Sequence, residues 1–505
     1  MFRQLPVIVI SIGLLSRANA QAPNVSQVLM WSTVTNTNVG PGASQSTRPD
    51  FIPTISGVLP RALLSVYKVD VFENYLQPGR YSTANLSALN SAISSNVGLS
   101  LALIPVSSPA SAVISKTDPA TGASVGASST LGPVFTERAE TIGKRKFFVG
   151  FSHQNYHFTE INGQKLNGLT VLYPGGDPSA GGGRTNPATF NMGVDVRLSQ
   201  DLAFLTYGLT DRVDVSVGLP VVHAGVSATA YNGVLYAGEA NGNAPFNCWC
   251  QNTFAPGTFR LTEPLIGSSS ATKSGFGDLL VRTKGAVLER PNAVVAIGAD
   301  LRFATGDADN YLGTGTTTVK PFAAVSLYGK PTASGFVFSP HFNVGWQFSG
   351  KSPLGGQLSG SSQTATLSNG DKMTYSGAPL IASKDYLPDV FAWAVGTELG
   401  LGKRNTVVAD ILGNQIGWIN GAQGVKQGSA PGFSPLGSFA PTNAVGMVGS
   451  GKGSFSQYSG SFGYKTRVAG NLVATFNVLV RFDDNGLTAR AVPLFGLGYT
   501  FTTGH

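Results

Sequence analysis

The sequence is poor in charge, and it lacks long apolar runs beyond its first residues. Only 12% of the 505 residues are charged, which is low for a soluble α/β enzyme. After residue 20, no stretch reaches the roughly 18 uninterrupted apolar residues of a membrane-spanning helix. The formal charge is +8, but Lys and Arg are scattered without a basic stripe, so no nucleic acid partner is predicted.

Cysteine is nearly absent, with Cys248 and Cys250 as the two examples. In an oxidising compartment, this pair either closes a small loop as a disulfide or has no role. Two sulfur ligands without partners indicate a metal only weakly, and the five His residues show no zinc-protease spacing. We therefore predict no metal and no cofactor.

The first 20 residues have the pattern of a secretory signal. Arg3 precedes an apolar run from Leu5 to Leu15, and Ala18-Asn19-Ala20 forms a cleavage site with small residues. The run is too short to cross a bilayer as a helix. We expect export and a mature chain that starts at Gln21.

Alternating polarity is the main signal in the rest of the chain. From Phe190 to Leu219, apolar and polar residues take turns, as the two-residue period of a strand requires. We interpret the apolar face as lipid-facing and the charged face as lining a lumen. In the first of these strands, the outward set is Met192, Val194, Val196 and Leu198, and the inward set includes Asp195 and Arg197.

Twelve segments have this character, and the connections between them alternate between short and long. Short turns on one rim and long loops on the other are typical of outer-membrane barrels. The sequence predicts an all-β fold, an antiparallel transmembrane barrel of about 12 strands, with 14 as the alternative. The predicted strands start at Phe147 and then cover Ala188–Tyr207, Val213–Tyr231, Gly275–Val287, Ala293–Thr305, Val319–Tyr328, Phe336–Phe348, Val390–Leu401, Thr406–Trp418, Gln457–Val468, Asn471–Phe482 and Leu487–Phe501.

Three parts of the chain follow from these patterns. Residues 1–20 are the signal peptide, residues 21–134 form a mostly irregular N-terminal segment, and residues 135–505 form the barrel. Apolar residues from Leu86 to Leu101 recur at helical spacing, and Pro105 follows, so one helix is predicted in the N-terminal segment. The helix either packs at the barrel rim, which we favour, or plugs the lumen.

Charged residues on the predicted inward faces are the candidate functional residues. They either select solutes or brace a narrow barrel by pairing across it, and the sequence favours neither. The predicted lumen-lining residues are Asp195, Arg197, Asp214, Asp278, Arg282, Lys284, Asp300, Arg302, His341, Glu398, Asp410 and Arg481.

Enzymatic motifs are weak, and no catalytic residues are predicted. The glycine-rich stretch from Gly446 to Gly453 lacks the Ser or Thr of a phosphate-binding loop. His153 and His157 would share one face of a strand as polar lining. The oxygen-rich turn from Asp307 to Asn310 suits calcium, but an Asx turn explains it better.

Several stretches resemble one family of outer-membrane barrels, the family named after the meta-pathway of phenol degradation. They are Phe204–Pro220, Gly277–Lys284, and Asp300–Asp307 with Leu312–Gly315, within a similarity from Glu137 to Phe501. The family commonly has Pro where this chain has Ala304. The resemblance implies an architecture similar to aromatic-hydrocarbon and long-chain fatty-acid transporters, and the binding or passage of small compounds, including apolar or aromatic ones. It brings no catalytic residues.

We therefore expect a channel or transporter in a bacterial outer membrane, not an enzyme. The expected partners are the lipid bilayer, a small-molecule solute and the outer-membrane assembly machinery, because the last strand resembles an assembly signal that ends in an aromatic residue at Phe501. The chain is expected to be a monomer. The alternative is a surface-binding or structural barrel that transports nothing.

Overall fold

The computed structural model describes residues 84–105, 115–117, 124–126, 130–173, 188–235, 259–260, 267–329, 336–356, 358–366, 372–402, 404–420, 425–428, 445–448 and 452–502. The predicted signal peptide and the Cys248 and Cys250 pair lie outside these residues. Within them, strands dominate, and α3 (Ala84–Leu103) is the one α-helix. None of the helices in these ranges is long and apolar enough to cross a membrane.

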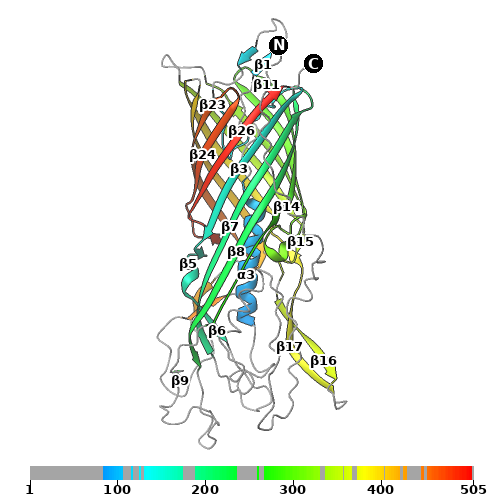
Figure 1. Cartoon of the computed structure of the whole chain (residues 1–505), viewed down its shortest axis with the longest axis vertical. Coiled ribbons are helices and arrows are strands. Elements are labelled where there is room, and N and C mark those ends of the chain that lie inside the picture. Colours follow the sequence, from blue (N-terminus) through cyan, green and yellow to red (C-terminus); the bar gives the residue numbers. More distant parts are fainter. Residues whose placement is uncertain are drawn as a thin grey trace, which may run out of the picture.

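Twelve antiparallel strands form a closed barrel, which confirms the predicted fold class and strand count. Each wall strand pairs with the next, and pairing of the last strand, β26, with the first, β3, closes the ring (Figure 1). The wall consists of β3 (Lys146–Phe158), β7 (Ala188–Gly208), β8 (Val213–Leu235), β11 (Leu279–Arg290), β12 (Ala293–Phe303), β13 (Thr318–Leu327), β14 (Phe336–Ser349), β19 (Val390–Leu401), β20 (Asn405–Asn420), β23 (Lys452–Ala469), β24 (Leu472–Arg481) and β26 (Ala491–Thr502).

Strand β10 (Gly267–Phe276) extends the wall. It pairs with β8, as β11 does further along, so β10 and β11 form one long strand interrupted at Gly277 and Asp278. Strand β6 (Leu169–Tyr173) pairs with the first residues of β7, Ala188 to Met192, and lies outside the ring of twelve.

The remaining elements are short and lie in the connections. The β16–β17 hairpin projects from the end with the long loops, and β1 lies at the opposite end (Figure 1). These elements are β1 (Ser115–Thr117), β2 (Ser124–Gly126), β4 (Glu160–Ile161), β5 (Gln164–Lys165), η3 (Leu166–Gly168), β9 (Phe259–Arg260), η4 (Ala308–Asn310), β15 (Lys351–Ser352), β16 (Leu358–Thr366), β17 (Lys372–Ala382), β18 (Asp385–Tyr386), β21 (Val425–Gly428), β22 (Val445–Val448) and β25 (Leu487–Thr488).

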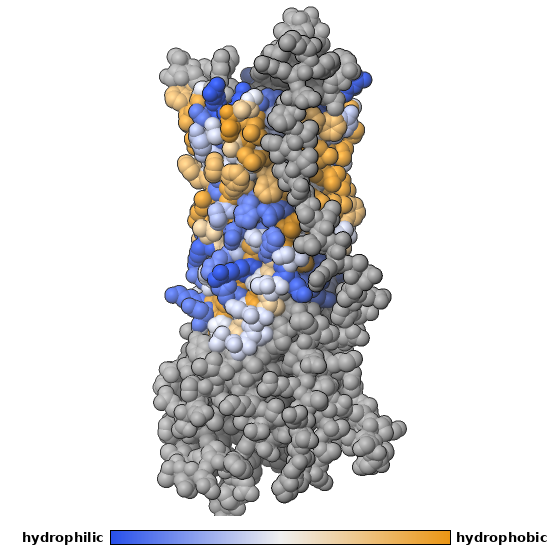
Figure 2. All heavy atoms as spheres, viewed as in Figure 1, coloured by the Kyte–Doolittle hydropathy of each residue, from blue (hydrophilic) through white to orange (hydrophobic). Residues whose placement is uncertain are grey.

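An apolar belt surrounds the part of the barrel near the short turns. Large apolar side chains point outward there, including Phe462 (69% exposed), Phe338 (55%) and Phe476 (52%). Figure 2 shows this belt in orange, with a polar band between it and the end that carries the long loops. Exposed aromatic and aliphatic side chains on a closed barrel match a surface that contacts lipid. The barrel is therefore embedded in a membrane by its wall.

Helix α3 lies in the half of the barrel on the side of the β16–β17 hairpin (Figure 1), and residues Ala92 to Leu99 are buried on all sides of the helix. Its side chains, such as Ile93 and Val97, share one apolar core with Met192 and Val194 of β7. Its buried Ser94 hydroxyl hydrogen-bonds to the Tyr311 hydroxyl at 2.8 Å. The helix ends two residues before Pro105, which disfavours helical backbone at the preceding position.

Candidate functional site

A stretch of chain without regular structure crosses the inside of the barrel near the short turns. We call residues 130–143 the lumen segment. Its backbone N–H groups have no strand or helix to pair with, and inward side chains of the wall accept several of them. The acceptors are Thr406 Oγ1 for Leu131, Glu398 Oε2 for Gly132, Asp410 Oδ2 for Phe135, Ser326 Oγ for Ala139 and Asp214 Oδ2 for Ile142, at 2.8 to 3.2 Å.

Two buried ion-pair groups fix the lumen segment to the wall. Arg138 pairs with Glu398 at 2.8 Å, and both side chains are completely buried. Glu137 pairs with Arg282 at 2.8 Å and with Lys284 at 2.6 Å. Buried charges are tolerated when they are paired and hydrogen-bonded, as here.

Most of the predicted lumen residues therefore hold the lumen segment or another internal element. Asp214, Arg282, Lys284, Glu398 and Asp410 contact the segment directly, as described above. The His341 ring lies 2.6 Å from Glu398, and Asp300 pairs with Arg282 at 2.6 Å. For the others, Asp278 accepts from Gly306 and Thr314, Arg302 donates to the Leu101 carbonyl at 2.9 Å, and Arg481 pairs with Asp483 at 2.9 Å.

Asp195 and Arg197 do not line the lumen, and this part of the prediction is wrong. They pair with each other at 2.8 Å on the outer surface, with side chains 37% and 66% exposed. The opposite face of β7, with Met192 and Val194, packs inward against α3. This half of β7 extends past the apolar belt into water, so its polar face is outside and its apolar face covers the helix. Alternation defines two faces but does not say which one is inside.

The imidazoles of β3 also point outward. His153 lies 2.8 Å from Asp201 of β7, and His157 lies 3.0 Å from Asp195. Within the described residues, no group of three or more His, Cys, Asp or Glu side chains is arranged to hold a metal ion. The turn at Asp307 is an Asx turn, because its carboxylate accepts from the Asp309 N–H at 3.1 Å.

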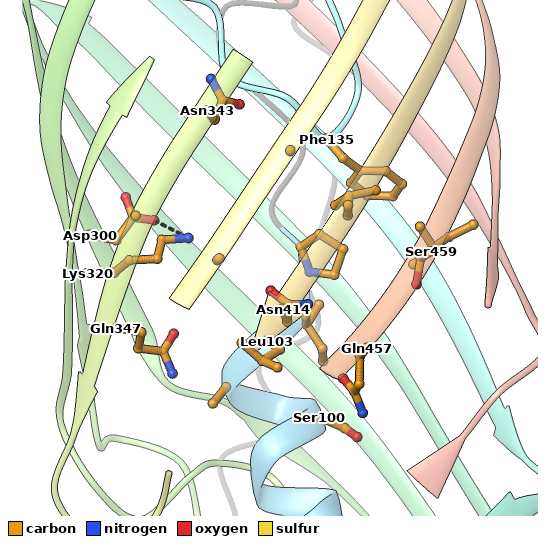
Figure 3. Close-up of a pocket in the computed structure, with 18 of the residues that line it drawn as sticks. Ser100, Leu103, Phe135, Asp300, Lys320, Asn343, Gln347, Asn414, Gln457 and Ser459 are labelled. Atoms are coloured by element: carbon orange, nitrogen blue, oxygen red, sulfur yellow. Dashed lines mark ion pairs between the residues drawn. The ribbon is translucent and has the colours of Figure 1, made fainter. Parts of the chain in front are cut away.

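A cavity of about 210 Å³ remains between the end of α3 and the lumen segment, and we call it the chamber. Leu103 from the helix and Phe135 from the lumen segment lie on either side of it (Figure 3). Polar side chains of the wall surround it, among them Asn343, Gln347, Asn414, Gln457 and Ser459.

The charges around the chamber are unequal. Four basic side chains and two acidic ones line it, namely Arg282, Arg302, Lys320 and Arg481 with Glu137 and Asp300. The Asp300 carboxylate lies 3.3 Å from the Lys320 ammonium, and Figure 3 shows this pair at one wall of the chamber. The chamber is therefore basic overall.

Sequence reasoning missed the part of the site that does not come from strands. Glu137 and Arg138 lie in a stretch without periodicity, so no strand pattern marks them as facing the lumen. Lys320 lies on a predicted strand whose inward face also carries Phe322 and Ala324, so polarity does not mark that face. Gln347 carries no charge, and the predicted set contains only charged or titratable side chains.

Comparison with known proteins gives one family match. The model described as "Putative MetA-pathway of phenol degradation" matches residues 175–378. This range is shorter than the predicted similarity and spans less than half of the chain. None of the curated proteins matches the sequence significantly.

Solved structures with a similar arrangement are outer-membrane barrels at low sequence identity. An outer membrane channel from Pseudomonas putida F1 is 11% identical, with a TM-score of 0.37, covering 72% of this chain and 98% of that one. A FadL homologue from Pseudomonas aeruginosa is 9% identical, with a TM-score of 0.27, covering 71% and 89%. The toluene transporter TbuX of Ralstonia pickettii is 8% identical, with a TM-score of 0.27, covering 72% and 90%.

These TM-scores are low, so the fold assignment depends on the strand pairing of the chain itself. The family match is independent of them. Over residues 175–378, the chain's resemblance to the phenol-degradation family of outer-membrane barrels is confirmed.

Proposed function

We propose that this protein is a monomeric outer-membrane channel or transporter for small compounds. The observation that carries the proposal is the chamber of about 210 Å³ inside the barrel. A barrel with a purely structural interior can fill its lumen with side chains, whereas a cavity lined by polar and apolar groups suits a solute. The names of the family and of the similar channels support small aromatic or apolar compounds as candidates.

Passage of a solute through the barrel requires the lumen segment to move. The chamber lies between α3 and the lumen segment, and the buried Arg138 and Glu398 pair anchors the segment on the side of the short turns. Movement or local loosening of this segment would connect the chamber to that end of the barrel. Transport is thus proposed to be gated from within the chain.

Insertion by the outer-membrane assembly machinery is part of the same proposal. Strand β26 closes the barrel against β3, and its outward residues Phe495, Leu497, Tyr499 and Phe501 are 37 to 46% exposed. This apolar alternation at the end of the last strand supports recognition by that machinery.

The test is solute flux through the purified full chain. The protein would be reconstituted into liposomes and planar bilayers, and swelling with small neutral solutes and single-channel conductance would be recorded. We expect measurable flux, which rises in Glu398→Gln because the lumen segment loses its anchor. Asp195→Asn, which removes an exposed partner of Arg197, is the matched control and should behave as wild type.

Absence of flux and of conductance in both the wild type and Glu398→Gln would overturn the proposal. It would favour the alternative of a surface-binding or structural barrel. Adhesion that is lost when residues 350–389 are removed would then support that alternative directly.

A further inference from the structure

The acidic side chains of the chamber are already neutralised by basic ones. Arg282 donates to both oxygens of Asp300, at 2.6 and 2.9 Å, and to Glu137 at 2.8 Å. Glu137 also forms an ion pair with Lys284, and Asp300 also forms one with Lys320. The group of three cations and two carboxylates therefore keeps one net positive charge next to the cavity.

Arg302 adds a second positive charge at the same wall. Among the described residues its one hydrogen bond goes from Nη1 to the carbonyl oxygen of Leu101, which is neutral. Arg302 pairs with Thr318 in the sheet register and Asp300 pairs with Lys320, so Arg302 and Lys320 are diagonal neighbours on β12 and β13. Diagonal neighbours with long side chains lie close enough to contact one ligand group together.

Hydrogen-bond donors without partners near the chamber also favour a ligand with acceptor atoms. The Gln347 amide is 4% exposed, and its Nε2 has no hydrogen-bond partner in the structure. It comes from β14, beside Lys320 of β13, and both are drawn at the same wall in Figure 3. On the opposite wall, Arg481 uses Nη2 for Asp483 and Asn485, while its Nε is buried without a partner.

The chamber also has an apolar side. Leu103 and Ile104 at the end of α3, Phe135 of the lumen segment and Leu412 of β20 line it. A buried donor or cation without a partner is unfavourable, so a ligand that supplies acceptor oxygens relieves the imbalance. The volume is below the roughly 300 to 1,000 Å³ of pockets for drug-sized ligands, so the ligand is small.

We propose that the chamber binds a small organic anion, a carboxylate with a compact apolar body, with its oxygens facing Arg302, Lys320 and Gln347. This inference rests on the proposed function and names the class of solute for the same chamber. The apolar body would lie against Leu103 and Phe135. A neutral compound of the same shape would leave the net positive charge of the chamber without a counter-charge and would bind more weakly.

Benzoate and benzamide form a suitable pair of probes, because they share a ring and differ in charge. Binding to the full chain in detergent micelles would be measured by calorimetry at about 0.1 M salt. We expect benzoate to bind at least about ten-fold more tightly than benzamide, since hydrogen bonds to charged groups are the stronger ones.

The variants locate the binding. Arg302→Gln and Lys320→Gln should each weaken benzoate binding by about ten-fold and leave benzamide unchanged, and Arg302→Lys should retain most of the affinity. Arg197→Gln removes an exposed charge of the outer surface and is the matched control. Heat-dependent mobility on gels reports folding, and Lys320, at 32% side-chain exposure, offers a second site if Arg302→Gln does not fold.

Equal affinity for benzoate and benzamide would overturn the inference, as would benzoate binding that neither substitution changes. Flux separates this failure from that of the proposed function. Flux of neutral solutes without charge-selective binding would leave the channel intact and reject the anion site. Charge-selective binding without any flux would keep the site and reject transport.

Discussion

Gly396 shows how one side chain decides whether the lumen segment fits. It lies on an inward position of β19, where a Cβ atom would be 2.1 Å from Asp410 Oδ1 and 2.6 Å from Thr136 Oγ1. These two side chains share a 2.8 Å hydrogen bond that attaches the lumen segment to β20. The absence of a side chain at this position therefore lets the segment lie against the wall.

Gly396→Ala should destabilise the protein by about 1 to 3 kcal/mol, because the added methyl must displace this contact. Urea unfolding of the protein in lipid vesicles measures the change. Gly168→Ala is the control, since nothing lies within 4 Å of its added Cβ. Equal stability of the two variants would contradict the close approach seen at β19.

Glu398 tests the buried ion pair in the same way. Glu398→Gln leaves the Arg138 guanidinium buried without its counter-charge, which typically costs about 3 to 5 kcal/mol. The expected result is easier proteolysis of the lumen segment and a lower free energy of unfolding. Asp195→Asn breaks an exposed pair and should change stability by less than about 1 kcal/mol. A similar cost for both would mean that the lumen segment does not depend on Glu398.

At the scale of elements, strands were predictable and the lumen segment was not. The period of two predicts β19 with its observed ends, Val390 and Leu401. It also predicts both ends of β7 to within one residue of where that strand begins and ends. The lumen segment has no period because it takes its hydrogen bonds from side chains of the wall. The direction of the β7 faces also depends on what lies beside each half of the strand, lipid or α3, and local sequence does not contain that information.

The loop from Thr305 to Thr317 should dock on α3 in a pH-dependent way. Burial, followed by the nearby Asp307 carboxylate, raises the pKa of Asp309 to about 6. The docked loop therefore binds the Asp309 proton more tightly than the open loop does. Its stabilising effect is complete below about pH 4 and is lost as the pH rises through about 6.

Because Asp309 is partly exposed, we expect a difference of about 1 kcal/mol, or roughly five-fold in protection. Hydrogen exchange of the amides near Tyr311, corrected for intrinsic rates, would be compared at pH 4.5 and pH 7.5. In Asp309→Asn the two values should agree. A pH dependence that persists unchanged in this variant would assign it to another group.

For the whole molecule, the count of alternating segments together with the alternation of short and long connections predicted a barrel of about twelve strands, with 14 as the alternative, and the strand pairing confirms twelve. The filling of the lumen was beyond the sequence, because it depends on which inward charges meet across the barrel. The charges around Arg138 and Glu398 brace the barrel interior by fixing the lumen segment to the wall. Selection of solutes remains a proposal for Arg302 and Lys320 at the chamber.

The height of the membrane on the barrel follows from where outward residues change from apolar to polar. On β23, Phe462 lies within the apolar belt, whereas Asn155 of β3 is exposed among His153 and His157, beyond the belt. An Arg near the middle of the bilayer costs about 2 to 4 kcal/mol, and one near the interface costs about 0 to 1. Phe462→Arg should therefore lower the free energy of unfolding in lipid vesicles strongly, and Asn155→Arg should change it little.

Urea titration of the vesicle-inserted protein measures both variants against wild type. Asn155 pairs with Ser199 of β7, next to the outward Arg197, so the second variant tests the level of the Asp195 and Arg197 pair. If Asn155→Arg cost as much as Phe462→Arg, lipid would reach this level and the pair would be embedded in the membrane. A small cost places the pair in water, where an exposed ion pair and an inner face packed on α3 are both stable.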